Sequence, residues 1–260
     1  MKGKFLFLGS GGSLGIPIVT CTCAVCKSSS PFNKRLRPSG LLTIGEKSFL
    51  IDVGPDFRDQ ALRYGIKHLD GILLTHTHYD HVGGLDEVRV FYFLQKQRIP
   101  ILSSKETFEE VEHRYHYLFR APPGSPNRCP QFEFELLKED FGQITFVGEK
   151  FDTVSYFQAG MKVTGYRIGN FAYISDIRHY DDLVVERLQG VEILVVSALR
   201  ESPSEVHFSL EEAAAFSHKV GARTTFLTHI THDLDHDETN AKLPKGIALA
   251  HDGLEIEIHG

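Results

Sequence analysis

The strongest constraint on this chain is a cluster of three histidines and one aspartate at residues 76–81, His-Thr-His-Tyr-Asp-His. An apolar run over residues 71–75 predicts a buried strand before the cluster, and a glycine pair at 83–84 follows it. Imidazole and carboxylate groups together suit zinc, manganese or iron. A polar loop with incidental histidines is the alternative, but this spacing after a buried strand favours a metal centre.

The spacing within the cluster predicts two neighbouring ion sites. Alternate residues of an extended segment point the same way, so His76 and His78 can chelate one ion. Asp80 and His81 lie where the chain turns into the next element, and they can face a second ion. Other candidate ligands lie far along the chain, so a single domain over residues 1–260 is the simplest organisation.

Short apolar runs alternate with helical patterns, which favours an α/β fold. Strands are expected at residues 4–8, 41–44, 48–53, 71–75, 171–175, 191–196 and 224–228, and helices at 55–64, 105–117, 181–188 and 209–220. Ser209 and Glu212 form a capping box at the last of these helices. Asp252 and Gly253 predict a hairpin turn between strands at 247–250 and 254–258. Apart from the expected helix at 105–117, residues 95–143 give no clear pattern, and 120–127 are expected to form a loop.

Three cysteines, Cys21, Cys23 and Cys26, lie within one short segment near the N-terminus. Cysteines this close pair poorly as disulfides, whereas thiolates in a turn chelate zinc well. Reduced cysteines without a metal are the alternative. Three thiolates would leave a fourth ligand position open, and Cys129 has no evident partner.

The charge balance limits the range of partners. A formal net charge of −6 argues against a general nucleic-acid binder, which would normally carry a basic face. Bound cations would still permit an anionic substrate. The four apolar residues at 5–8 are too few for a signal peptide, and no run approaches the ~18 apolar residues of a membrane span. We therefore expect a cytoplasmic chain with no membrane partner.

The motif at residues 76–81 resembles the His-x-His-x-Asp-His motif of the metallo-β-lactamase superfamily. Further segments are similar to its PhnP-type phosphodiesterase branch, namely residues 9–17, 21–26, 52–56, 165–167, 173–176 and 227–232. The resemblance implies an αβ/βα four-layer sandwich, with two mixed β-sheets flanked by helices and the site at one sheet edge. It covers most of the chain but not residues 95–143, whose role stays open.

The resemblance also implies ligands that spacing alone does not reveal. Asp176 would be the carboxylate that bridges two ions. His229 would complete the second site with Asp80 and His81. His232 would complete a Cys₃His structural zinc that ties the N-terminal loop to the strand end carrying His229.

One position departs from the family pattern. The third histidine expected on the first ion falls at Gln158, and no histidine occurs between His116 and His179. An amide oxygen can coordinate a metal, but it is a neutral and weaker donor than imidazole. We therefore keep Gln158 as a metal-ligand candidate, in a first site that is weak, differently selective or empty. His179 is a second candidate for the place of the missing histidine.

The implied activity is hydrolysis of a small phosphodiester, cyclic ones included, through a metal-activated hydroxide. His207 matches the family's catalytic histidine and would protonate the leaving alkoxide, and Asp80 is the other catalytic candidate. The expected cofactors are two divalent ions, manganese or zinc, and one structural zinc. The expected partner is a small anionic phosphodiester, and a homodimer is left open.

Two other functions compete with this interpretation. One is a metal-binding protein of the same fold in which Gln158 weakens the first site and catalysis is slight. The other is a tRNA-processing-type nuclease, which shares the metal chemistry. The sequence offers neither a basic exosite nor a clear tRNA-binding arm, so a long nucleic acid is not the expected substrate.

Overall fold

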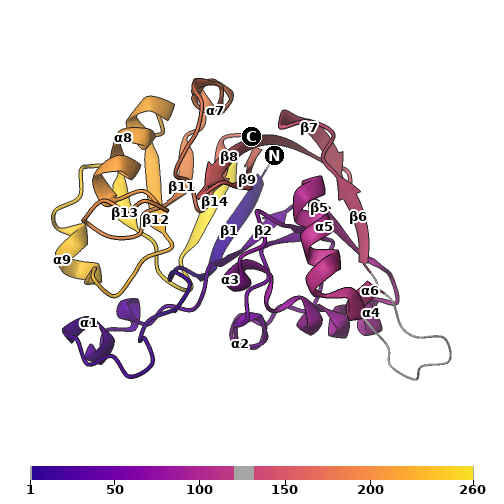
Figure 1. The fold of residues 1–260 in the computed structure, drawn as a ribbon, viewed down its shortest axis with the longest axis horizontal. Helices are drawn as coiled ribbons and strands as arrows, with labels where there is room; N and C mark the ends of the chain where they lie inside the picture. Colours follow the sequence, from indigo (N-terminus) through magenta and orange to yellow (C-terminus); the bar gives the residue numbers. More distant parts are fainter. Residues whose placement is uncertain (1, 120–131, 260) are drawn as a thin grey trace.

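Two seven-stranded β-sheets pack face to face in the computed structural model, which describes residues 2–119 and 132–259 (Figure 1). The first sheet has the order β14 (Glu255–His259), β1 (Lys2–Gly9), β2 (Ser39–Ile44), β3 (Lys47–Ile51), β4 (Gly71–Leu73), β5 (Ile99–Ser103) and β6 (Phe132–Leu136). The second has the order β13 (Ile247–Leu249), β12 (Thr224–Thr228), β11 (Ile193–Ser197), β10 (Phe171–Ile174), β9 (Met161–Ile168), β8 (Glu149–Gln158) and β7 (Phe141–Phe146).

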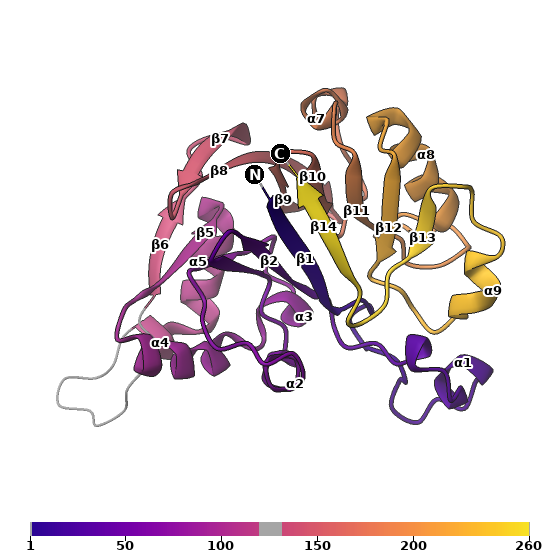
Figure 2. The ribbon, with the colours of Figure 1, turned by 180° about the vertical axis from the view of Figure 1, so that it is seen from behind.

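Both sheets are mixed. In the first, β14, β1, β2 and β3 pair antiparallel, whereas β3, β4, β5 and β6 pair parallel. In the second, β13, β12, β11 and β10 pair parallel, whereas β10, β9, β8 and β7 pair antiparallel. The two ends of the described chain lie beside each other, because β1 and β14 are neighbours (Figure 2).

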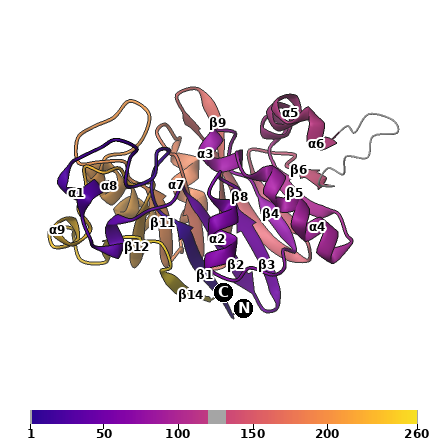
Figure 3. The same cartoon turned by 90° about the horizontal axis from the view of Figure 1, so that it is seen from below.

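Helices cover the outer faces of the two sheets (Figure 1). The first sheet carries α2 (Phe57–Arg63), α3 (Tyr79–Val82), the 3₁₀ turn η2 (Leu85–Val88), α4 (Arg89–Gln95), α5 (Lys105–Arg114) and α6 (His116–Phe119). The second carries α7 (Asp182–Leu188), α8 (Leu210–Val220) and α9 (His236–Asn240). Viewed from below, α1 (Ala24–Lys27) lies beside α9, and it is followed in the chain by the 3₁₀ turn η1 (Pro31–Asn33) (Figure 3).

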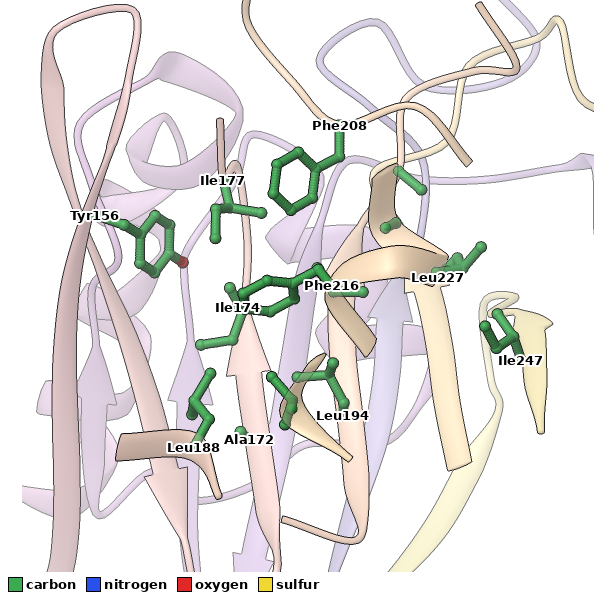
Figure 4. Close-up of a cluster of buried hydrophobic side chains, with 14 of the residues drawn as sticks. Tyr156, Ala172, Ile174, Ile177, Leu188, Leu194, Phe208, Phe216, Leu227 and Ile247 are labelled. Carbon is green, nitrogen blue, oxygen red and sulfur yellow. The ribbon is translucent and has the colours of Figure 1, made fainter. Parts of the chain in front are cut away.

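Three buried apolar clusters hold these four layers together. The cluster between the sheets is rich in aromatic residues, and the Phe5 ring contacts those of both Phe171 and Tyr173. A second cluster joins the first sheet to its helices, and a third joins the second sheet to α7 and α8. Figure 4 shows part of the third, in which Phe216 of α8 lies near Ile174. The predicted αβ/βα sandwich is therefore confirmed.

The predicted C-terminal hairpin is wrong. Gly253 does adopt the turn conformation, with φ 87°, but β13 joins the second sheet and β14 joins the first. The Asp252 carboxylate accepts hydrogen bonds from the backbone and hydroxyl of Ser10 and from the Leu36 N–H. These bonds hold the turn where the chain crosses between sheets, so local turn chemistry did not indicate which strands pair.

The stretch that gave no clear pattern contains regular elements, among them β5, β6 and the start of β7. The expected loop at 120–127 and Cys129 lie outside the described residues. The predicted helix at 105–117 divides into α5 and α6, because Tyr115 interrupts it at φ −112°. None of the helices among residues 2–119 and 132–259 is both long and apolar enough to cross a membrane.

Candidate metal centre

The candidate ligands lie at or just beyond strand ends. His76 and His78 follow β4, Asp80 and His81 lie on α3, Gln158 ends β8, Asp176 follows β10 and His229 follows β12. The two sheets thus supply one site, with the His76–His81 segment on the first sheet and the other ligands on the second.

Three residues at this site have a strained backbone conformation. Asp52, Asp176 and His229 adopt the left-handed conformation, with φ of 59°, 53° and 60°. Such conformations cost free energy for residues other than glycine and persist where the surrounding structure imposes them. This conformation turns the side chains of Asp176 and His229 into the site at the ends of strands that would otherwise continue past it.

A first triad consists of His76, His78 and Asp176. His76 Nε2 lies 3.1 Å from His78 Nδ1 and 3.4 Å from Asp176 Oδ2. His76 and Asp176 are 0% and 1% exposed, whereas His78 is partly open to solvent. This triad is the predicted first ion site without Gln158, which stands where a third neutral ligand was expected.

A second triad consists of Asp80, His81 and His229. Asp80 Oδ2 lies 3.4 Å from His81 Nε2 and 3.2 Å from His229 Nε2. Asp176 Oδ1 lies 3.5 Å from both of these imidazole nitrogens. Because the other oxygen of Asp176 faces His76, its carboxylate lies between the two triads.

The donor geometry fits divalent ions. Imidazole and carboxylate ligands at 2.0–2.2 Å from a tetrahedral ion are separated by about 3.4 Å, which is close to the distances above. His81 Nε2 is buried without a hydrogen-bond partner although it faces two carboxylates. A buried, unpaired ligand atom is costly, and a bound cation would satisfy it.

The charges of the second triad are strongly coupled. Burial lowers the pKa of His81, but Asp176, Asp80 and Asp52 outweigh it and hold that pKa well above its ordinary value. Burial raises the pKa of Asp80, yet His81 and His229 reverse the effect and lower it. The carboxylates are therefore ionised, and without a metal they favour protonated imidazoles. A divalent ion bound there would take the place of this positive charge.

Gln158 and His207 lie together beside Asp176. Gln158 is 2% exposed, and its amide Nε2 lies 3.2 Å from Asp176 Oδ2 and 2.9 Å from His207 Nε2. Its Oε1 is buried without a hydrogen-bond partner. The amide nitrogen, rather than the oxygen expected to ligate a metal, thus faces the shared carboxylate.

His207 lies at the edge of both triads. Its ring stacks on that of His229 with centroids 4.6 Å apart, and its Nδ1 is 3.9 Å from Asp176 Oδ2. Burial lowers the pKa of His207 to about 4. Next to it, Phe208 inserts into the cluster that α8 forms with the second sheet (Figure 4). The two predicted catalytic residues, His207 and Asp80, are therefore at the same site.

Residues behind the candidate ligands hold them in place. Asp52 accepts a hydrogen bond from His81 Nδ1 at 2.7 Å, Thr75 contacts Asp52 and His76, and Ser175 donates to Asp176 Oδ1 at 2.8 Å. Arg114 of α5 donates to the Thr77 carbonyl at 2.7 Å and so supports the His76–His78 segment. The only local signal for Thr75 and Ser175 was a hydroxyl residue directly before a ligand.

His179 does not substitute for the missing histidine. Its side chain is exposed, and only its backbone pairs with Phe157 beside Gln158. The basic segment at residues 34–37 is partly buried. Arg35 is 2% exposed and its guanidinium bonds to Ser10 and His236.

The four residues predicted for a structural zinc also come together. The Sγ atoms of Cys21, Cys23 and Cys26 lie 3.2, 3.5 and 3.5 Å from His232 Nδ1. Sulfur at 2.3 Å and nitrogen at 2.0–2.1 Å from a tetrahedral zinc are about 3.6 Å apart, so the arrangement fits that ion. The Cys₃His cluster joins the N-terminal loop to the segment after His229.

Comparison with known proteins adds a family description to this geometry. Residues 47–230 match the family described as "Beta-lactamase superfamily domain". A solved structure described as a new diphosphatase from the PhnP family is 40% identical, with a TM-score of 0.91, and the match covers 99% of this chain and 98% of the other. Zn²⁺-bound PqqB from Methylobacterium extorquens matches with a TM-score of 0.77 over 97% of this chain and 99% of PqqB, but at 18% identity it supports the fold alone.

A curated relative is longer than this chain. It is an octanoyltransferase of Porphyromonas gingivalis, 34% identical over 98% of this chain but over only 51% of its own length. The chain therefore spans about half of that protein, and the activity in its name describes a chain about twice as long.

Proposed function

The chain belongs to the β-lactamase superfamily and, within it, to the PhnP family; on this premise we propose that it is a metal-dependent hydrolase that cleaves small phosphodiesters. The observation that carries the proposal is the convergence of two metal-ligand triads on the single carboxylate of Asp176. Two ions that share one ligand in this way suit displacement at phosphorus.

The proposed ligands of the first ion are His76, His78 and Asp176, with Gln158 beside them. Those of the second are Asp80, His81 and His229, together with Asp176. Manganese or zinc bound there would supply the charge that activates water and neutralises an anionic phosphoryl group.

The protein's own groups would orient the reaction. Asp52 and Ser175 hold His81 and Asp176 in place through short hydrogen bonds. His207, neutral in the free protein because burial lowers its pKa to about 4, faces the shared carboxylate. An anionic substrate beside His207 would favour its protonated form, which can then give a proton to the leaving alkoxide.

The proposal is tested by turnover of bis(p-nitrophenyl) phosphate with added manganese. Removal of ligand-supporting residues costs ~10–100-fold, so loss of the shared ligand in Asp176→Ala should cost more than about 100-fold. Asp181→Ala is the matched control, because Asp181 is exposed and its side chain makes no capping bond. If the wild type is as inert as Asp176→Ala with manganese, zinc and iron, the phosphodiesterase proposal fails.

A second candidate is cleavage of a phosphoric anhydride, which the diphosphatase description of the 40% identical structure favours. Both reactions need the same displacement at phosphorus and the same ligands. Comparing kcat/KM for bis(p-nitrophenyl) phosphate and for a nucleoside diphosphate in one preparation separates them. The diester should be the better substrate under our proposal, and the anhydride under the second.

A further inference from the structure

A buried polar chain behind the candidate metal centre connects ligands of both ion sites. Its members Asp52 and Thr75 are each 0% exposed. Asp52 directly follows β3, and Thr75 directly precedes His76. Neither belongs to the ligand clusters found among the described residues, but each contacts a histidine that does.

Three donors face the Asp52 carboxylate. Oδ1 accepts the backbone N–H of Thr75 at 2.8 Å. Oδ2 lies 2.8 Å from the Thr75 hydroxyl and 2.7 Å from His81 Nδ1. Because a carboxylate can only accept, His81 carries a proton on Nδ1, and its Nε2 faces Asp80 and Asp176, where it would be the atom that binds an ion.

The Thr75 hydroxyl makes a similar contact with a ligand of the first ion site. Its Oγ1 lies 2.8 Å from Asp52 Oδ2 and 2.9 Å from His76 Nδ1, and it has a single proton to donate. Donation to His76 would leave two oxygen lone pairs facing each other at 2.8 Å. The proton therefore goes to Asp52, and His76 donates from Nδ1 to the hydroxyl, which leaves its Nε2 free.

We propose that Thr75 is a positioning residue for the first ion site, because its hydroxyl extends to His76 the support that Asp52 gives directly to His81. The inference rests on the proposed function only in that the two histidines bind divalent ions. One carboxylate would then fix the tautomer and ring orientation of one ligand at each site. Such supporting groups raise metal affinity by holding the ligand atom toward the ion.

The contacts from Asp52 to His81 and, through Thr75, to His76 form a relay with two links, and each link can be broken separately. Thr75→Val removes the link to His76 and keeps the bond from Asp52 to His81, whereas Thr75→Ser restores a hydroxyl. Asp52→Asn removes the charge from both links. Thr164→Val is the matched control, because Thr164 is also 0% exposed and donates its N–H to the Thr75 carbonyl, but its hydroxyl has no partner.

The readout is zinc affinity at each site, measured by titration, with cobalt(II) spectra to separate the thiolate site from the two imidazole–carboxylate sites. We expect Thr75→Val to weaken one of the two sites about 10–100-fold and Asp52→Asn to weaken both. Thr75→Ser and Thr164→Val should match the wild type. The inference is overturned if Thr75→Val leaves both affinities unchanged or lowers them equally.

A measurement on the wild type keeps the inference testable even if Thr75→Val does not fold. Long-range ¹H–¹⁵N spectra of histidine-labelled, zinc-loaded protein should show His76 and His81 protonated at Nδ1, and a proton at Nε2 of His76 would overturn the relay. Zinc bound at both sites without phosphodiester turnover would instead refute the proposed function alone. A wild type that binds zinc at neither site would overturn both.

Discussion

Gln158 is the residue at which this site departs most from a symmetric pair of ion sites. It is buried beside Asp176 and His207, and its amide nitrogen faces both. The first triad therefore has two imidazoles and one shared carboxylate, while the second has two imidazoles, its own carboxylate and the shared one. Fewer and less basic ligands favour weaker binding at the first site.

Replacing Gln158 with histidine should therefore strengthen the first site. We expect Gln158→His to raise its manganese or zinc affinity at least about tenfold and to increase turnover at limiting metal. Metal titration and phosphodiester turnover measure the two effects. Gln143→His adds a histidine at an exposed position and should change neither. Equal affinities in Gln158→His and the wild type would show that Gln158 is no handicap.

At the scale of elements, the start of α8 positions the catalytic candidate. His207 lies two residues before the N-cap Ser209, whose side chain accepts the Glu212 N–H while the Glu212 side chain accepts the Ser209 N–H. Glu212 also pairs with Arg178 at 2.5 Å, and Arg178 lies two residues after Asp176. This confirms the predicted capping box and links the helix start to the shared carboxylate.

Ser209→Ala should lower the free energy of unfolding by about 1 kcal/mol, because it leaves an amide at the start of α8 without its acceptor. Urea denaturation followed by circular dichroism gives this value. Ser202→Ala, at an exposed position, should change stability by less than about 0.5 kcal/mol. If the two variants are equally stable, the cap does not hold the helix start in place.

At the scale of the whole molecule, the sequence predicts local features better than long-range ones. The His76–His81 motif, the strand at 224–228 and the helix at 181–188 follow from local pattern, and the structure has them within a residue or two. Asp176 and His229 were expected only through family resemblance, because folding alone brings them to His81. The hairpin at Asp252 was wrong for the same reason, since a turn does not determine which sheet receives the next strand.

The long β8–β9 pair was also not expected from the pattern. β8 carries exposed Phe157 between buried Tyr156 and Gln158, which obscures the alternation of apolar and polar residues. A buried glutamine at a strand end is explained only by the site that it faces. Local pattern therefore could not reveal it.

The Cys₃His cluster ties two distant parts of the chain, so its loss should affect the whole molecule. We expect Cys23→Ser to reduce the metal content by one ion per chain. Zinc present at 1,000 times its Kd stabilises a fold by about 4 kcal/mol, which sets the scale of the expected loss in unfolding free energy. Elemental analysis and thermal unfolding measure these changes, with Cys129→Ser as the control. An unchanged metal content in Cys23→Ser would contradict a zinc at this cluster.

The most direct test of the metal-centre assignment is a crystal structure of the zinc-loaded protein with anomalous diffraction at the zinc edge. We expect two peaks on either side of Asp176, the first reached by His76 and His78 and the second by Asp80, His81 and His229. A third peak at Cys21, Cys23, Cys26 and His232 serves as an internal control for zinc loading. A peak at the cysteines with none beside Asp176, and with the imidazoles turned apart, would show that these residues do not form a metal centre.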